Sequence, residues 1–330
     1  MAKTVRFHEA GGPEVLRLEE REPGEPGPGE VRLRIEAIGL NRAEALFRRD
    51  VYIEPVKRFP ARLGNEASGV VEALGPDVTG LDVGQAVSVL PSFSPNEYGV
   101  YAERALVPAA ALVPRPDGVD AVTGAAVWMP YLTAYGAMAE TGGIRAADVA
   151  VVNAASSSLG LAAIQTANRL GATPIAVTRT RAKRERLLEA GAAQVIVSDE
   201  EDVTGRVREL TGGRGAEFVL DAVAGPGVTE LARAVAADGT LLLWGAQSGQ
   251  PTPYPGFELN MPALNMRTFT MLEITRDPAR LRRAKAFITS GLRTGMLRPV
   301  VDRLFPLQDI VAAHRHLESN EQFGKIVVTV

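Results

Sequence analysis

The first third of the chain shows apolar and polar residues in alternation. KTVRF (3–7) and EVRLRIEAIGLN (30–41) alternate with a period of two, and ASGVVEAL (67–74) and QAVSVL (85–90) follow with Gly and Pro between them. A period of two predicts strands with one buried face, and Gly and Pro predict turns between them. This part of the chain is therefore predicted to form a compact β-barrel.

From about residue 122 the pattern changes to short apolar runs separated by amphipathic stretches. Nearly continuous apolar strands with helical crossovers predict a parallel sheet covered by helices on both faces. The predicted helices include 181–192 and 228–239, the second of which ends at Gly239, and a later one at 279–292 precedes a last strand at 325–330. The predicted strands of the sheet are 149–153, 174–178, 194–198, 216–223, 239–245 and 267–274. The fold class is therefore predicted to be α/β with a doubly wound sheet.

The composition narrows the class of protein. The 330 residues are 46% hydrophobic and 23% charged, and the net charge is −3. This balance gives no global reason to expect nucleic acid or an acidic membrane as a partner. No apolar run reaches the ~18 residues of a membrane helix, and the first residues show no apolar signal segment. We expect a cytoplasmic enzyme, and the absence of cysteine excludes disulfides and thiolate metal sites.

A strand followed by a turn and a helix forms the first candidate site, at VAVVNAASSSLGLAAIQTANRLGA (149–172). The amides at a helix N-terminus bind phosphate, and glycines in such loops let the backbone approach a diphosphate. Here three serines occupy the approach, and serine is small, caps helices and adds a hydroxyl donor. The alternative is a capped helix without a ligand. The candidate diphosphate loop consists of Ala155, Ser156, Ser157, Ser158, Leu159 and Gly160.

The end of the next strand indicates which dinucleotide would bind. NAD-binding folds place an acid about 20 residues after the loop, where it binds the ribose 2′-hydroxyl. This chain instead has Thr178, Arg179, Arg181 and Lys183 in that region, with no acid at the strand tip. Cations there would bind a 2′-phosphate and favour NADP(H). A solvated basic helix face is the alternative.

At this point the chain resembles the zinc-independent quinone oxidoreductase branch of the medium-chain dehydrogenase/reductase family, over essentially its whole length. The motifs that carry the resemblance are AASSSLGLAAIQTANRLGA (154–172), GNEASGVVEALGPDVTGLDVGQAV (64–87) and YLTAYGAM (131–138). The resemblance implies a GroES-like catalytic domain at 1–121, a Rossmann domain at 122–275 that binds NADP(H), and a C-terminal helix and strand at 276–330 that complete the catalytic domain. It also implies a homodimer.

Zinc is not expected. Zinc-dependent relatives use cysteines and a histidine, but this chain has no cysteine, and Asn65 stands in GNE where their histidine lies. His314 and His316 are two residues apart and so do not share a helix face. Glu66 remains, and without a metal we expect it to be structural.

Without a Lewis acid the oxidation of an ordinary alcohol is difficult, because nothing stabilises the alkoxide. Hydride transfer to a quinone or an α,β-unsaturated carbonyl is easier, because the anion formed needs only hydrogen-bond donors and a proton. The resemblance places Asn41 at the edge of the active site. It also places Tyr52 where the zinc-free enoyl-thioester reductases have a tyrosine that assists protonation. A packed ring is the alternative for Tyr52, and Leu46 replaces a tyrosine common in quinone reductases.

The remaining candidates come from strand ends and from aromatic positions. Tyr98, Trp128, Met129 and Tyr131 are expected to line a pocket for a flat acceptor, or else to lie in the core. Asp221 is expected at the cofactor or as a turn cap, and Asn320 at the cofactor edge or in a surface turn. The other expected cofactor residues are Thr133, Val223, Gly245 and Ala246.

Three functions compete on this basis. The first is an NADPH-dependent reductase of quinones or activated double bonds. The second is an enoyl-thioester reductase, for which Arg48, Arg49, Lys57 and Arg58 would form a basic rim around the thioester arm. The third is a non-enzymatic NADPH-binding structural protein, because the serines in the loop are compatible with a degenerate cofactor site.

Overall fold

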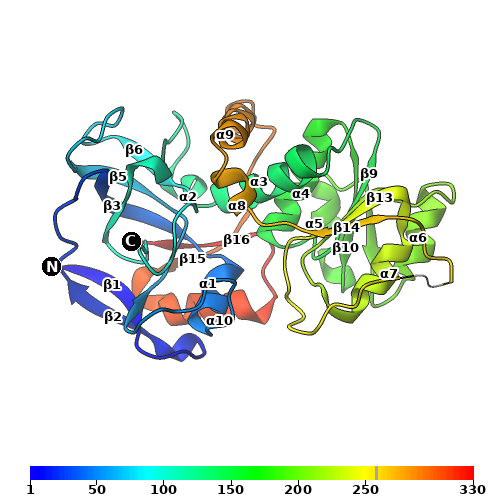
Figure 1. Cartoon of the computed structure of the whole chain (residues 1–330), viewed down its shortest axis with the longest axis horizontal. Coiled ribbons are helices and arrows are strands. Elements are labelled where there is room, and N and C mark those ends of the chain that lie inside the picture. Colours follow the sequence, from blue (N-terminus) through cyan, green and yellow to red (C-terminus); the bar gives the residue numbers. More distant parts are fainter. Residues whose placement is uncertain (257–258) are drawn as a thin grey trace. The chain divides into compact units, whose positions relative to one another are not determined.

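The computed structural model describes residues 1–256 and 259–330. The chain forms two compact units, one of Met1–Met129 with Pro299–Val330 and one of Pro130–Arg298. Figure 1 shows the elements of each unit coloured along the sequence. Among the described residues, no helix is long and apolar enough to cross a membrane.

Most strands of the first unit pair antiparallel, as the alternation predicts, whereas Val301–Pro306 and Lys325–Thr329 pair in parallel. Its larger sheet has the order β15-β16-β3-β5-β6-β8, with β7 also paired to β3, and its smaller sheet has the order β2-β1-β4. The strands are β1 (Ala2–Phe7), β2 (Leu16–Arg21), β3 (Glu30–Gly39), β4 (Ala61–Arg62), β5 (Ala67–Leu74), β6 (Ala86–Val89), β7 (Arg104–Pro108), β8 (Leu112–Pro114), β15 (Val301–Pro306) and β16 (Lys325–Thr329). The helices are α1 (Arg42–Arg48), α2 (Ala121–Gly124) and α10 (Ile310–Ser319), with short 3₁₀ turns at Pro13–Val15, Ala109–Ala111 and Leu307–Asp309.

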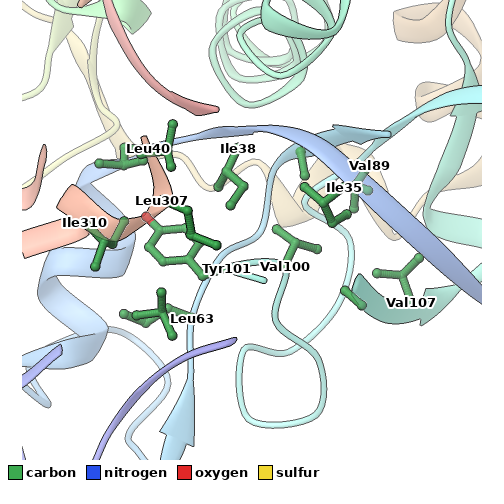
Figure 2. Packing of buried hydrophobic residues seen from close by; sticks show 14 of the residues in the cluster. Ile35, Ile38, Leu40, Leu63, Val89, Val100, Tyr101, Val107, Leu307 and Ile310 are labelled. Atoms are coloured by element: carbon green, nitrogen blue, oxygen red, sulfur yellow. The ribbon is translucent and has the colours of Figure 1, made fainter. Parts of the chain in front are cut away.

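Figure 2 shows the core of this unit, which joins residues from both ends of the chain. Ile35 and Ile38 of β3 and Leu63 lie in one buried cluster with Leu307 and Ile310. Burial of such side chains contributes ~1.5–3 kcal/mol each. The segment after residue 299 is therefore part of the hydrophobic core of the unit and stabilises it directly.

The second unit contains a six-stranded parallel sheet with the order β11-β10-β9-β12-β13-β14. In chain order within the sheet this is 3-2-1-4-5-6, the strand order of the doubly wound dinucleotide-binding fold. The predicted α/β fold, with a GroES-like unit and a Rossmann unit, is therefore confirmed. The strands are β9 (Val149–Val152), β10 (Thr173–Thr178), β11 (Gln194–Val197), β12 (Ala216–Asp221), β13 (Val235–Leu243) and β14 (Asn265–Thr268).

Helices connect the first five strands of this sheet, as crossovers between parallel strands usually do. Helix α3 (Trp128–Tyr135), at the boundary between the units, continues into a π-helical turn at Gly136–Thr141. The other helices are α4 (Ser158–Leu170), α5 (Arg184–Glu189), α6 (Val203–Leu210), α7 (Val228–Arg233), α8 (Leu272–Thr275) and α9 (Pro278–Arg293), with 3₁₀ turns at Arg181–Lys183 and Gly225–Gly227.

Two predicted elements differ from the structure. The helix predicted at 228–239 ends at Arg233, and β13 begins at Val235, because Val235 pairs with Ala216 and the ladder continues past a bulge. Gly239 therefore lies inside a strand. The strand predicted at 267–274 ends at Thr268, opposite the last residue of β13, and α8 follows it.

Helix α9 belongs to the second compact unit, although the sequence analysis grouped it with the C-terminal segment. The guanidinium of Arg169 on α4 donates to the carbonyl of Phe287 and lies 4.1 Å from the centroid of that ring. Gly291 on α9 lets Arg169 come this close, because a Cβ there would lie 2.2 Å from its Nη1 atom. These contacts hold α9 on the sheet-covering helix α4.

Candidate functional site

The candidate diphosphate loop lies between β9 and α4 and presents the N-terminus of a 13-residue helix. Ser157 is the N-cap, and its hydroxyl oxygen accepts a hydrogen bond from the amide of Gly160 at 3.0 Å. The remaining first-turn amides have no partner within the helix, and the aligned peptide dipoles make this end electropositive. The loop therefore has the polarity that an anion needs.

Gly160 is required by close packing rather than by an unusual backbone conformation. A Cβ at this position would lie 2.5 Å from the carbonyl oxygen of Ala155 and 2.6 Å from its Cα. Ala155 is fully buried, and its amide donates to Val177 of β10. The first turn of α4 therefore lies directly against the loop, which is the role of the last glycine in dinucleotide-binding turns.

The structure brings one of the predicted cations into contact with the loop. The ammonium of Lys183 donates to the hydroxyl of Ser156 at 3.1 Å. Thr178 at the end of β10 is buried, whereas Arg179 is exposed and makes no ion pair with any described residue. Arg181 pairs with Glu200 on the surface, at 2.6 Å. Of the three predicted cations, Lys183 therefore contacts the loop directly, Arg181 is paired on the surface, and Arg179 is exposed at the end of β10.

The carboxyl ends of β9 and β12 meet where the strand order reverses, which is where ligands bind in this class of sheet. Asn153 connects them, because its side-chain amide donates to Asp221 Oδ1 at 2.8 Å. Asp221 also accepts from the amides of Val223 (2.9 Å) and Ala224 (2.8 Å). Its carboxylate therefore holds the turn after β12, as the turn-cap alternative states. Asn153 was not among the sequence candidates.

The turn after β13 brings two further candidates to the same edge of the sheet. A Cβ on Gly245 would lie 2.6 Å from the carbonyl oxygen of Ala222, so the two turns are in close backbone contact. Ala246 follows directly and is exposed. Both residues are positioned by backbone geometry and contribute no reactive group.

The first unit contains the other candidate region, which starts at Asn41. Asn41 caps α1, and its Oδ1 atom accepts from the ammonium of Lys325 at 2.6 Å. Its side-chain NH₂ group lies 3.2 Å from both Glu66 Oε2 and the carbonyl oxygen of Gly39. Asn41 is buried, and its polar atoms are already bonded within the protein.

Three charged side chains surround Asn41 in the core of this unit, and we call Asn41, Glu44, Glu66 and Lys325 the buried charge network. Lys325 and Glu66 form an ion pair of 2.6 Å with side-chain exposures of 1% and 0%. Glu66 also accepts from the amide of Met129 at 2.9 Å. Burial raises the pKa of Glu44 to about 7, against an opposing effect from the charge of Lys325.

Glu44 and Lys325 were not among the residues predicted from the sequence, although each has a signal there. Asn41 and Glu44 form the N-x-x-E pattern of a capping box, and both capping hydrogen bonds are present. Lys325 is the first residue of the otherwise apolar strand KIVVTV. A charged side chain that is buried with such a strand needs a partner of opposite charge. The expected structural role of Glu66 matches its place in this network.

Tyr52 is partly buried against the apolar core of the first unit. Its hydroxyl makes no hydrogen bond to any residue in the described ranges 1–256 and 259–330, and burial raises its pKa. Tyr98 donates to Glu30 Oε1 at 2.8 Å. The hydroxyl of Tyr52 is therefore the more available of the two.

Three of the four candidates on α3 are buried, whereas Met129 is half-buried. Trp128 is 1% and Tyr131 is 2% exposed, and Tyr131 donates to Gln165 at 2.7 Å. Thr133 is also buried. These placements favour the core-packing alternative, and the predicted pocket and cofactor roles on α3 stay predictions.

Asn320 lies in an exposed turn, as its surface-turn alternative states, whereas one residue of the predicted basic rim is buried. Asn320 ends α10 with a φ of 61° and accepts from the guanidinium of Arg42 at 2.5 Å. Arg48 is fully buried, donates to the carbonyl of Gly11 and pairs with Glu318. The rim prediction was therefore wrong for Arg48, because its guanidinium is enclosed by α10 and its own helix.

Two family models match the chain. The alcohol dehydrogenase GroES-like domain matches residues 27–117, and the zinc-binding dehydrogenase domain matches residues 158–289. A solved quinone oxidoreductase of Escherichia coli, in complex with NADPH, superposes with a TM-score of 0.92 at 28% identity and covers 99% of this chain and 100% of its own. The fold and the matched domains define a medium-chain dehydrogenase/reductase.

Two curated relatives indicate the branch of this superfamily to which the chain belongs. A quinone oxidoreductase of Pseudomonas aeruginosa is 32% identical over 332 residues, which covers 99% of each chain. A 2-haloacrylate reductase of Burkholderia is 29% identical and also covers 99% of both chains. The chain belongs to the quinone oxidoreductase branch of the medium-chain dehydrogenase/reductase superfamily.

The name of one matching domain implies zinc, but the residues present do not fit a zinc site. The chain has no cysteine, and no group of three His, Asp or Glu side chains in the described residues could hold a metal. Asn65 is buried, and its Oδ1 atom has no hydrogen-bond partner among them. Lys325 adds a cation next to Glu66, and that charge opposes binding of a second cation.

Proposed function

We propose that the protein is an NADPH-dependent, zinc-independent reductase that transfers hydride to a quinone or an α,β-unsaturated carbonyl. The observation that carries the proposal is the contact of Lys183 with Ser156, which joins a cation after β10 to the loop before α4. Relatives named quinone oxidoreductase and 2-haloacrylate reductase act on acceptors of these two kinds and support it.

The residues of the second unit fit the cofactor. The first-turn amides of α4 and the hydroxyls of Ser156 and Ser158 would hold the diphosphate. Arg179 and Lys183 would bind the 2′-phosphate, because charge-assisted hydrogen bonds to phosphate are strong and Arg179 lies exposed at the end of β10. Gly245 and Ala246 would allow a close approach of the backbone.

When bound, the cofactor supplies a hydride to a carbon of the acceptor, whose oxygen then carries negative charge until a proton arrives. Tyr52 holds its proton at neutral pH, because burial raises the pKa of its hydroxyl. A neutral phenol can donate a hydrogen bond to the developing oxyanion and stabilise it. No metal is needed for this acceptor class.

The cofactor prediction is tested by titrating NADPH and NADH into the protein and following nicotinamide fluorescence. We expect NADPH to bind more tightly, and we expect Arg179→Ala to weaken NADPH binding at least tenfold and to leave NADH binding unchanged. Arg206→Ala is the matched control, since it removes an arginine from the surface of α6 in the same unit. Equal binding of both cofactors to the wild-type protein would exclude the 2′-phosphate role.

The free hydroxyl of Tyr52 also favours a second candidate, an enoyl-thioester reductase. This candidate predicts that Tyr52→Phe lowers kcat for enoyl-thioesters and enones at least tenfold and changes quinone turnover little, because a quinone product anion is a weak base. Tyr135→Phe is the control, because it removes a hydroxyl that bonds Glu140 in the other unit. Unchanged enone turnover in Tyr52→Phe would remove the tyrosine from the mechanism.

A homodimer and a cytoplasmic location complete the proposal. The dimer rests on the resemblance to the family, and the location rests on the absence of cysteine and of a strongly basic charge balance. Light scattering of the purified protein would test the dimer, with a mass of one 35.1 kDa chain as the contrary result.

A further inference from the structure

The first unit contains a cavity of about 240 Å³ with an unusual lining. Five arginines and one acid contribute to it: Arg6, Arg21, Arg58, Arg62, Arg104 and Glu22. All of these residues belong to the unit formed by Met1–Met129 and Pro299–Val330, whereas the predicted dinucleotide residues of the loop belong to the other unit. We call this feature the arginine pocket.

The sheet register brings the arginines together. Arg6 of β1 and Arg62 of β4 are direct partners across an antiparallel pair. Like charges at directly opposite positions destabilise a sheet. The fold therefore concentrates positive charge at this place despite its cost to stability.

Hydrogen bonds to backbone carbonyls hold two of the guanidinium groups at the pocket. Arg6 donates to the carbonyl of Pro60 at 3.0 Å, and Arg62 donates to the carbonyl of Glu97 at 2.7 Å. A carbonyl orients a guanidinium without cancelling its charge. Arg6 Nη1 also donates to Glu19 at 3.2 Å, and the other N–H groups of each fork are still available to an anion.

The acids nearby neutralise part of this charge, including that of Arg104, which pairs with Glu72 at 2.8 Å. Glu19 is shared by Arg6, Arg21 and His8, and Glu22 pairs with the N-terminal ammonium. Arg58 and Arg62 form no ion pair with any residue in the described part of the chain. The pKa of Arg62 is lowered by burial and by the charges of Arg6 and Arg58, as expected where cations crowd together.

We propose that the arginine pocket binds the diphosphate group of an anionic ligand, at a site distinct from the proposed NADPH site. Guanidinium forks bind phosphate oxygens in pairs, and several forks facing one cavity match a group with several charged oxygens. The cavity has room for such a group. The proposal goes beyond the proposed reductase activity and does not depend on it.

Inorganic pyrophosphate and ADP are the two probes, because the same diphosphate chemistry occurs in a free anion and in a nucleotide. Each is titrated by calorimetry into the protein loaded with one equivalent of NADPH, at constant ionic strength set with NaCl. We expect pyrophosphate to bind with a stoichiometry near one. Additional binding of ADP would show that the pocket accepts a nucleotide, and its absence would restrict the ligand to the inorganic anion.

Arg58→Gln and Arg62→Gln test the location. We expect each to weaken pyrophosphate binding at least tenfold and to leave NADPH binding unchanged. Arg315→Gln, an exposed arginine of α10 that does not line the pocket, is the matched control and should bind as the wild type does. Arg58 makes no hydrogen bond within the described chain, so Arg58→Gln keeps the fold intact even if Arg62→Gln does not.

Two results would overturn the proposal. One is the absence of saturable pyrophosphate binding to the NADPH-loaded wild-type protein. The other is binding that Arg58→Gln leaves at the wild-type affinity, which would place the anion elsewhere. Loss of NADPH binding in Arg179→Ala with intact pyrophosphate binding would separate this site from the cofactor site.

Discussion

The diphosphate loop of the second unit and the buried charge network of the first differ in how they are built. The loop is one continuous segment whose function rests on backbone amides, a capping serine and one close glycine contact. The network joins Asn41, Glu66 and Lys325, of which the last two are 259 residues apart in the chain. The diphosphate loop therefore depends on residues that are close in the sequence, whereas the buried charge network forms only when distant segments fold together.

The two regions also differ in their exposure to water. The side chains of the network are almost completely buried, so each charge depends on its partner. The serines of the loop are half-buried, and water can replace a lost partner. Mutations should therefore have large and pH-dependent effects in the network and small ones in the loop.

The largest effect is expected for Lys325→Met. This change leaves Glu66 buried without its cation, and the loss of one partner from a buried pair costs ~3–5 kcal/mol of folding free energy. Urea unfolding followed by circular dichroism would measure it. The double variant Lys325→Met, Glu66→Gln should recover part of the loss, and equal stability of the single variant and the wild type would show that the pair is not buried in solution.

A smaller effect is expected from the titration of Glu44. Its folded pKa of about 7 lies above the ordinary 4.5, so the folded state binds the proton more tightly and loses stability as pH rises through this interval. At ~1.4 kcal/mol per unit, the loss amounts to about 2–3 kcal/mol between pH 4.5 and pH 8.

Glu44→Gln removes this titration. The glutamine amide has nearly the same shape as the protonated carboxyl group and, like it, has a carbonyl oxygen acceptor and a donor. We therefore expect the stability of the variant relative to the wild type to be higher at pH 8 than at pH 5. The urea midpoints of unfolding of both proteins at the two pH values measure this difference. Parallel pH profiles would show that Glu44 keeps an ordinary pKa in the folded protein.

The smallest effect is expected in the loop. Ser157→Ala removes the cap of α4 and should cost ~1 kcal/mol, together with part of the NADPH affinity. Asp277→Ala is a matched control, because Asp277 caps α9 in the same unit and its loss should cost a similar amount without affecting NADPH. If the two variants bind NADPH equally, the capping serine has no role beyond helix stability.

The sequence predicted the parts of the molecule that depend on nearby residues. Apolar runs and their spacing predicted the parallel sheet, and the serines with Gly160 predicted the loop and its cap. The end of the helix at Arg233 was not predictable, because the pairing of Val235 with Ala216 decides it. A strand register is a tertiary property and outweighs local helix propensity.

The residues of the candidate site also differ in whether nearby sequence was enough to predict them. The contact between Lys183 and Ser156 joins two predicted residues, and Asp221 has the turn-capping role that was left open. Lys325 was missed, because one charge in an apolar strand does not reveal its partner. The arginine pocket was missed for the same reason, since the facing of Arg6 and Arg62 follows from strand pairing.

The place of Lys325 in the chain affects how the protein is made. Glu66 leaves the ribosome 259 residues before the lysine that neutralises it. At ~5–20 residues per second, this interval lasts roughly 10–50 s. All of Pro130–Arg298 is synthesised during that time. We therefore expect the second unit to fold on the ribosome before the first unit, which is incomplete until β16 has been synthesised.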